Sequence, residues 1–266
     1  MIENWIHAQT DVNVAQFDEA MEAHYPESRE YLQDPRKYLA RIGIQCNFMD
    51  AVKMLDWEQY LGKAGTVLDM GCGGGWLTGY LSAFASVNKI YALDSSRHFV
   101  RDILPGVVEL MGGDKEKIAP IQGLFTPLLF KDGVLDVVVA SSVLHHAESL
   151  EGVLTEIRRT MKKGGLLCIL NETPSSAARH LLSVSKGFVK IVANLMSRNY
   201  MSVSPAISSS GYLNNPHLGD RNYPLWYWNE AIRRAGFSIV KYLDTGLPTV
   251  KGERGQSLCH FVCKAV

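Results

Sequence analysis

A glycine-rich segment is the part of the chain best suited to bind a ligand. Asp69-Met70-Gly71-Cys72-Gly73-Gly74-Gly75 follows a short apolar run and leads into a helical pattern. Glycines at such a turn let the backbone approach a ligand closely and adopt conformations closed to other residues. A nicotinamide-dinucleotide fingerprint would need one more glycine at position 76 or 78, which are Trp76 and Thr78. The spacing therefore favours a different ligand.

Other polar side chains follow later apolar runs. Asp94 comes after Ile90-Tyr91-Ala92-Leu93, His145 and His146 follow the run 135–140, and Glu172 follows 166–170. Histidine suits a general base near neutral pH, and an ionised carboxylate only accepts hydrogen bonds. These residues are candidates for binding and proton transfer.

The elements that must position these residues alternate between strand and helix. Apolar runs at 66–70, 89–93, 117–122, 135–140 and 166–170 are separated by helical patterns at 76–87, 96–111 and 149–162. Strands that are apolar on both faces and separated by helices indicate a parallel sheet covered on both sides. A helix at 226–235 and strand-like runs at 237–243 and 257–264 follow, and 12–61 is predicted to be helical.

The pattern Asp-x-Gly-x-Gly-x-Gly after an apolar strand resembles motif I of the class I S-adenosylmethionine-dependent methyltransferases. Asp94 lies nineteen residues after Gly75, where that family keeps an acidic residue for the ribose hydroxyls. Residues 136–146 and 157–165 are similar to its fourth strand and to the helix and turn before its fifth. The most similar subgroup is the type-11 methyltransferases, which include enzymes of quinone and natural-product biosynthesis.

The resemblance implies a Rossmann-like α/β fold. The expected sheet has seven mostly parallel strands with an antiparallel C-terminal strand. The implied cofactor is S-adenosylmethionine, with S-adenosylhomocysteine as product, and no metal is expected. The residues that would bind the cofactor are Asp69, Gly71, Cys72, Gly73, Gly75, Asp94, Ser95, Leu124, Phe125 and Ser141.

The chain departs from the family after the third strand. Many relatives have an acidic residue there that binds the adenine amino group, but this chain has Leu124. The adenine would then be held by apolar contact with Leu124 and Phe125, by a backbone carbonyl, or by Gln122.

Methyl transfer from a sulfonium is an in-line displacement, so the main task of the protein is positioning. A base is needed where the acceptor must lose a proton. In some relatives that methylate hydroxyls, a histidine after the fourth strand works with an acidic residue after the fifth. By this resemblance His145 would be the base, His146 the weaker candidate, and Glu172 the partner.

Four regions are expected from the pattern. They are an N-terminal helical lid (1–61), the cofactor-binding core (62–173), a cap insert (174–228), and a C-terminal helix and hairpin that complete the core (229–266). Six aromatic residues between 199 and 228 could wall the acceptor, with a satellite core or a dimer contact as the alternatives. The basic amphipathic stretch 181–198 could instead rest on a membrane surface, a less favoured reading. Tyr25, Tyr31 and Tyr38 are equal candidates to approach the cofactor from the lid.

Composition favours a small-molecule acceptor. The 27 basic and 27 acidic residues balance, which argues against binding nucleic acid by bulk charge. We therefore expect a methyltransferase for a small molecule, acting on oxygen in preference to nitrogen or carbon. A nucleic-acid or protein methyltransferase and a non-catalytic cofactor-binding protein are the alternatives.

Cellular location is also predicted from composition. The first 28 residues contain no Lys or Arg, so no leader is expected, and no apolar run approaches the ~20 residues of a membrane span. The five cysteines show no paired spacing and are expected to be reduced. A cytoplasmic monomer or homodimer is expected.

Overall fold

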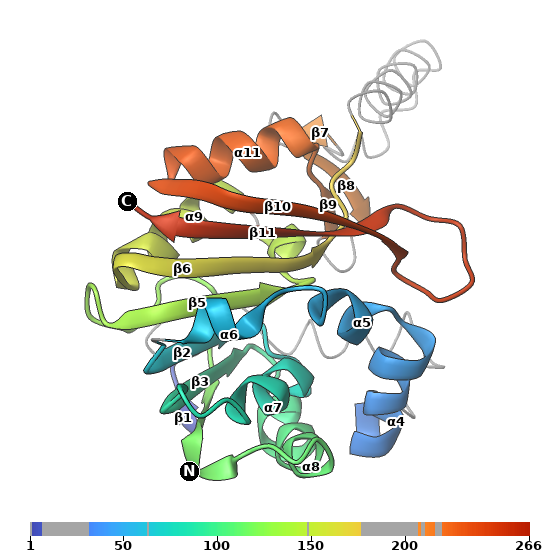
Figure 1. Cartoon of the computed structure of the whole chain (residues 1–266), viewed down its shortest axis with the longest axis vertical. Helices are drawn as coiled ribbons and strands as arrows, with labels where there is room; N and C mark the ends of the chain where they lie inside the picture. The colour runs from blue at the N-terminus through green and yellow to red at the C-terminus, as the bar shows by residue number, and fades with distance from the viewer. Residues whose placement is uncertain are drawn as a thin grey trace, which may run out of the picture.

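A computed structural model describes residues 2–6, 32–62, 64–147, 149–176, 207–208, 211–215 and 220–266. Its main sheet has eight strands in the order β1-β4-β3-β2-β5-β6-β11-β10 (Figure 1). The strands are β1 (Glu3–Asn4), β2 (Thr66–Met70), β3 (Lys89–Asp94), β4 (Ile118–Gln122), β5 (Leu135–Ser141), β6 (Met161–Glu172), β10 (Phe237–Pro248) and β11 (Ser257–Ala265).

Strand direction follows the predicted Rossmann-like arrangement. Strands β1 to β6 pair in parallel, β11 runs antiparallel to β6, and β10 runs antiparallel to β11. Seven strands were expected, and the eighth is β1, which pairs with β4 through Glu3 and Asn4. The sequence assigned this segment to the helical lid, because a strand of two residues is too short for any periodicity to show.

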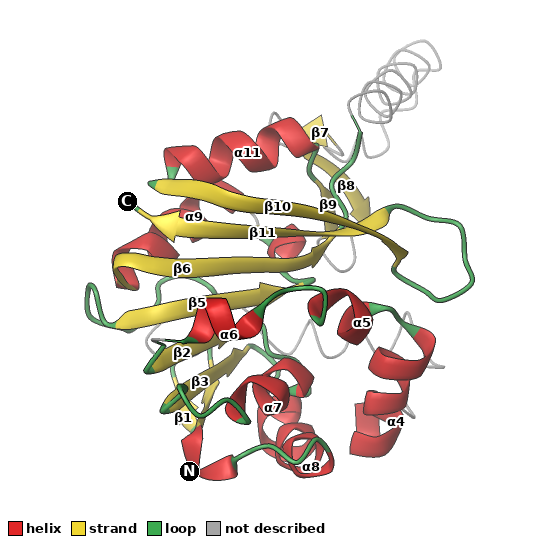
Figure 2. Ribbon diagram, in the orientation of Figure 1, coloured by secondary structure: helices red, strands yellow, loops and turns green. Residues whose placement is uncertain are grey.

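Two apolar layers cover the sheet. On β2, Leu68 and Met70 pack with α9 (Leu150–Thr160) and α11 (Leu225–Arg234), whereas Val67 packs with α7 (Trp76–Ser82) on the other face (Figure 2). Successive strand residues point to opposite faces, so a strand buried on both sides is apolar throughout. The same alternation places Asp69 on the α7 face.

Short helical segments precede β2 in the described N-terminal region. They are α4 (Pro35–Ala40), the π-helical turn η2 (Arg41–Gln45), α5 (Phe48–Val52) and α6 (Trp57–Leu61). Figure 1 shows α5 beside the tips of β5 and β6. Asn47 joins this region to the loop after β10: its backbone N–H donates to the Thr249 carbonyl (3.0 Å) and its Nδ2 to the Pro248 carbonyl (2.7 Å).

Part of the insert forms a second, three-stranded antiparallel sheet. Its strands are β7 (Ile207–Ser208), β8 (Gly211–Asn215) and β9 (Asp220–Asn222). The sequence pattern did not reveal these strands, because short polar strands lack the apolar alternation that marks a half-buried strand. The stretch 181–198 lies outside the described residues, so the cap remains a prediction.

Two aromatics of the expected cap belong to the main core. Tyr223 and Trp228 are each 1% exposed and pack edge to face with a centroid distance of 5.8 Å. Trp228 also stacks on Phe261 of β11. These two rings therefore stabilise the fold, whereas Trp226 is 52% exposed.

Two further features of the described residues concern membrane-spanning helices and cysteines. Within the described ranges, no helix combines the length and apolar character that crossing a membrane would require. All five cysteines are buried free thiols: Cys46, Cys72, Cys168, Cys259 and Cys263.

Candidate cofactor and catalytic site

The glycine loop after β2 has the backbone that its sequence predicts. Gly71, Gly73 and Gly75 have φ values of 69°, 51° and 83°, which lie in the left-handed region. A Cβ on Gly71 would lie 2.2 Å from a methyl of Val143. Both conformation and space therefore require glycine at the start of this turn.

Asp94, at the end of β3, links the first two strand-to-helix turns. Its Oδ2 accepts from the Gly73 backbone N–H (2.8 Å), and its Oδ1 accepts from that of Ser96 (2.9 Å). The structure thus brings together Asp94 and the glycine loop, as predicted. A carboxylate oxygen has more than one acceptor position, so these contacts leave capacity for hydroxyl donors.

The residues predicted near the adenine lie beside Asp94. The Gly123 N–H donates to the Asp94 carbonyl (2.9 Å), which places the turn with Leu124 and Phe125 next to the end of β3. Phe125 packs against the core, and Gln122 Nε2 donates to the Ser95 carbonyl (3.3 Å). Contact of these side chains with an adenine ring stays a prediction.

Asp69 is a carboxylate buried at the base of the loop. It is 1% exposed, and its Oδ2 accepts from the Thr78 hydroxyl (2.6 Å). Burial raises its pKa to about 7, opposed by the Thr78 hydrogen bond. A cationic ligand beside this carboxylate would favour its ionised form. This agrees with the predicted contact between Asp69 and the ammonium group of the methionine moiety.

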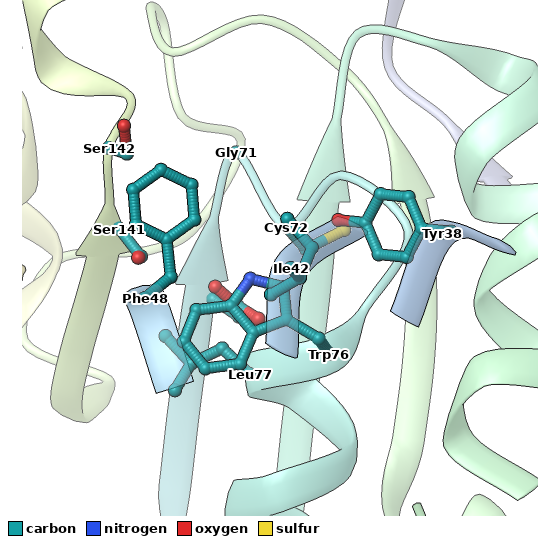
Figure 3. A pocket seen from close by; sticks show the side chains of 10 residues that line it. Tyr38, Ile42, Phe48, Gly71, Cys72, Trp76, Leu77, Ser141 and Ser142 are labelled. Carbon is teal, nitrogen blue, oxygen red and sulfur yellow. The ribbon is translucent and has the colours of Figure 1, made fainter. Parts of the chain in front are cut away.

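A cavity of about 150 Å³ lies in front of the loop (Figure 3). Tyr38 from α4 lies at one end and Phe48 from α5 at the other, with Ser141 and Ser142. The cavity is lined by Tyr38, Ile42, Phe48, Asp69, Gly71, Cys72, Trp76, Leu77, Ser141 and Ser142. It therefore joins the lid to four of the predicted cofactor-binding residues: Asp69, Gly71, Cys72 and Ser141.

Tyr38 is the lid tyrosine that reaches the loop. Its hydroxyl oxygen accepts from the Gly74 backbone N–H (3.0 Å), and its ring is 6% exposed. The sequence offered Tyr25, Tyr31 and Tyr38 without a rule to choose, and the first two lie outside the described residues. Trp76 both packs in the core, as expected, and lines the cavity.

The predicted catalytic pair is in contact. Glu172, 1% exposed, holds His145 through a 2.8 Å contact between its Oε2 and Nδ1 of the imidazole. Its Oε1 accepts from the backbone N–H groups of Val143 (3.0 Å) and Leu144 (2.9 Å), which fixes the turn η5 (Leu144–His146). His145 is a quarter exposed and its ring centroid lies 4.2 Å from that of His146.

Sequence reasoning missed a buried network behind the cavity. Asn171 donates from Nδ2 to the Ser141 hydroxyl (2.9 Å), and its backbone N–H donates to Nδ1 of His260 (3.0 Å). Nε2 of His260 in turn donates to the Ala51 carbonyl of α5 (2.9 Å), and burial lowers its pKa, which keeps the ring neutral. The sequence signal for this network was the polar pair Asn171-Glu172 at the end of an otherwise apolar strand.

Backbone strain marks the same edge of the sheet. Ser142 and Asn171 have φ values of 53° and 55°, in the left-handed region. Residues held there cluster at functional sites, where the surrounding structure determines them. Among the described residues, no group of three or more His, Cys, Asp or Glu could hold a metal.

The amino-acid sequence is similar to those of known methyltransferases. A family model described as "Methyltransferase domain" matches residues 68–169. The sterol 24-C-methyltransferase of Eremothecium gossypii is 30% identical over 205 residues, covering 71% of this chain and 46% of that protein. Sterol 24-C-methyltransferase erg-4 of Neurospora crassa is 29% identical over 182 residues, covering 61% and 44%. The chain thus spans about half the length of these curated relatives.

Solved structures share the fold. The 1,6-didemethyltoxoflavin-N1-methyltransferase of Burkholderia thailandensis superposes with a TM-score of 0.60 at 15% identity, covering 97% of this chain and 92% of that one. A SAM-dependent methyltransferase from Methanosarcina mazei gives 0.55 at 14% identity, covering 79% and 96%. These findings identify residues 68–169 as a methyltransferase domain, and the sheet order and the solved structures agree with the Rossmann-like fold expected for the class I, type-11 group.

Proposed function

We propose that the protein transfers a methyl group from S-adenosylmethionine to a small-molecule acceptor. The observation that carries this proposal is the glycine loop, with Asp69 beneath it and Asp94 bonded to it. The cofactor supplies the electrophilic methyl carbon of its sulfonium. The residues present fit it: Asp69 is a buried carboxylate with no ion pair among the described residues, and it lines the cavity in front of the loop together with Gly71.

Each side chain would have a distinct task. The Asp94 oxygens would accept from the ribose hydroxyls, and Asp69 would attract the ammonium group of the methionine moiety. Tyr38 would close the loop from the lid side through its contact with Gly74. Ser141 would border the methionine moiety, held in place by Asn171.

His145 is proposed as the general base. The Glu172 carboxylate only accepts, so it selects the tautomer with hydrogen on Nδ1 and leaves the basic lone pair on Nε2. His145 would take the proton of a hydroxyl acceptor on Nε2 as the methyl group passes to the acceptor oxygen, the C–S bond of the cofactor breaks and S-adenosylhomocysteine leaves. Glu172 then stabilises the imidazolium that forms, as in other carboxylate–histidine pairs.

The acceptor atom distinguishes two versions of this function. O-methylation fits a base that removes a hydroxyl proton. C-methylation is favoured by the relatives named as sterol 24-C-methyltransferases, and methylation of an alkene carbon also requires a proton to leave. We retain O-methylation of a small molecule as the first candidate and sterol-like C-methylation as the second. Residence in the cytoplasm stays a prediction.

Calorimetric titration with S-adenosylhomocysteine tests the cofactor assignment. We expect saturable binding to the wild type and a large loss in Asp94→Ala. Asp102→Ala is the matched control, because its exposed carboxylate pairs with Arg101 away from the loop. Absence of heat at millimolar ligand, or equal binding by wild type and Asp94→Ala, would contradict the proposal.

Transfer of a labelled methyl group then separates the acceptors. A panel of phenols and a panel of sterols with a side-chain double bond are incubated with the protein and labelled S-adenosylmethionine. Product from phenols alone supports O-methylation, and product from sterols alone supports the second candidate. Labelled nucleic acid or protein in place of either would overturn both.

A further inference from the structure

The described residues contain three buried side-chain atoms that have no hydrogen-bond partner. They are Oδ1 of Asn171, Oγ of Ser175 and Nε of Arg221. Leaving such a group unpaired costs roughly 1–3 kcal/mol, and native proteins contain few of them. Asn171 lies at the carboxyl end of β6, Ser175 follows this strand, and Arg221 lies on β9 of the insert. A buried polar atom without a partner in a native structure calls for an explanation, and a ligand is one.

Ser175 and Arg221 belong to segments that the backbone ties together. The Ser175 N–H donates to the Tyr223 carbonyl (3.1 Å), and the Leu225 N–H donates to the Ser175 carbonyl (3.2 Å). Arg221 lies on β9, two residues before Tyr223. The backbone of Ser175 and that of residues 223–225 therefore lie side by side, and Arg221 is close to this bridge in sequence.

Arg221 lies on a strand that packs against the turn with the histidines, because β9 contacts η5. The Tyr223 hydroxyl donates to the Ala147 carbonyl (2.8 Å), directly after η5. Burial raises the pKa of Tyr223 to about 12; the positive charge of Arg221 acts against this rise and the negative charge of Glu172 adds to it. The strand that carries Arg221 is thus next to the segment that positions His145.

Among the described residues, Arg221 takes part in no ion pair, whereas Arg159 and Arg234 each pair with a nearby carboxylate. A buried guanidinium nitrogen normally has a carboxylate or phosphate partner, because its planar donors match those oxygens.

We propose that Arg221 and Ser175 form a subsite for an anionic oxygen group, a carboxylate or a phosphate, on the methyl acceptor. This rests on the proposed methyltransferase function and deepens it by naming the acceptor class. The Nε–H of Arg221 and the hydroxyl of Ser175 donate to the anion while His145 faces the atom to be methylated. A neutral sterol would leave both donors unpaired, and a carbocation would be repelled by the guanidinium.

The resonance of the Arg221 Nε–H group gives a direct test. The protein is saturated with S-adenosylhomocysteine and titrated with benzoate, phenyl phosphate or neutral benzamide, while ¹H–¹⁵N spectra are recorded. We expect the Arg221 Nε–H signal to shift with one or both anions and not with benzamide, and the stronger anion identifies the group. No shift with either anion, or an equal shift with benzamide, overturns the subsite.

Variants test the same claim by affinity. We expect Arg221→Met to weaken anion binding at least about tenfold, Arg221→Lys to weaken it less because it keeps the charge, and Ser175→Ala to weaken it a few-fold. Arg234→Met is the matched control, since this exposed arginine pairs with Glu230 on α11. Anion binding by Arg221→Met equal to wild type contradicts the proposal.

Affinity for S-adenosylhomocysteine, measured on every variant, separates this inference from the proposed function. If the wild type does not bind it, the methyltransferase proposal fails. If all variants bind it and the anions do not discriminate among them, the subsite alone fails. If Arg221→Met does not fold, the wild-type spectra and Arg221→Lys decide.

Discussion

The cofactor half of the site and the acceptor half differ in how their polar groups are partnered. Beside the glycine loop, both Asp94 oxygens accept backbone N–H groups and Asp69 accepts the Thr78 hydroxyl. At the root of the insert, Ser175 and Arg221 each keep a buried polar atom without a partner. In the first half each carboxylate already has a hydrogen-bond donor from the protein, whereas in the second half two buried polar atoms have no partner and are proposed to meet one on the ligand.

The two halves also differ in the length of chain that their contacts span. The bond between Gly73 and Asp94 joins residues 21 positions apart. The bonds from Asn171 to His260 and from Asn47 to the Pro248 carbonyl span 89 and 201 positions. A common cofactor is thus held by a locally built turn, and the lid depends on segments that only the fold brings together.

The largest expected effect lies in the acceptor half. In Glu172→Gln, one amide oxygen can still accept from Val143 and Leu144, but the amide NH₂ faces His145 Nδ1 and moves the imidazole proton to Nε2. We expect kcat to fall by about 10²–10⁴-fold with the acceptor found in the methyl-transfer assay, while S-adenosylhomocysteine affinity stays unchanged.

His146→Ala is the control for that substitution, with an expected loss of less than about tenfold because the imidazole in contact with Glu172 Oε2 is that of His145. A kcat in Glu172→Gln within a few-fold of wild type would remove the pair from the mechanism. If Glu172→Gln also lost affinity for S-adenosylhomocysteine to a similar degree, the cofactor half and the acceptor half would not act independently.

Next in size is Asp94→Asn in the cofactor half. The amide cannot replace both charged acceptors for Gly73 and Ser96, and a hydrogen bond to a charged group contributes about 1.5–3 kcal/mol. We expect the Kd for S-adenosylhomocysteine to rise roughly 10- to 100-fold by calorimetry. Anion binding at the acceptor half should remain, and its loss would show that the halves are not separate.

The titration of Asp69 gives a pH-dependent effect confined to the cofactor half. Because its pKa is raised to about 7, a cationic ammonium group binds better once the carboxylate is ionised. We expect affinity for S-adenosylhomocysteine to fall by up to about tenfold for each pH unit below 7. Asp69→Asn should bind weakly and without this slope, and a slope kept in that variant would assign it to another group.

The same carboxyl affects the stability of the ligand-free protein with a defined sign. Its folded-state pKa lies above the ordinary 3.8, so the folded chain holds a proton that the unfolded chain releases. The stability from this group is fully present below pH 3.8 and is lost as pH rises through about 7. Denaturant unfolding at several pH values should show that Asp69→Asn loses this decline.

The smallest effect concerns the anchor of the lid. Asn47→Ala leaves the Pro248 carbonyl without its side-chain donor, at a cost of about 1 kcal/mol. Hydrogen exchange in α5 should quicken about fivefold, with little change in kcat. Lys251→Met removes an exposed ion pair with Asp50 and an exposed hydrogen bond to the Gly43 carbonyl, and should change exchange less. Equal effects from both variants would show that the buried contact has no special role.

Local sequence determined the cofactor half. The strand-turn-helix at 66–82, the left-handed glycines and the position of Asp94 follow from residue types and spacing, because each depends on neighbours close along the chain. The pairing of His145 with Glu172 was also predictable, since the carboxyl ends of adjacent parallel strands meet at one edge of the sheet.

Tertiary structure decided the rest. The choice of Tyr38, the contact of His260 with Asn171, and the unpaired groups of Ser175 and Arg221 depend on segments far apart in sequence. Hydrophobic periodicity cannot predict such contacts, because the spacing of apolar residues within a segment does not depend on its hydrogen bonds to distant segments. The sequence by itself therefore determined the class of cofactor, and the packing of lid, hairpin and insert against the sheet determined the surroundings of the acceptor.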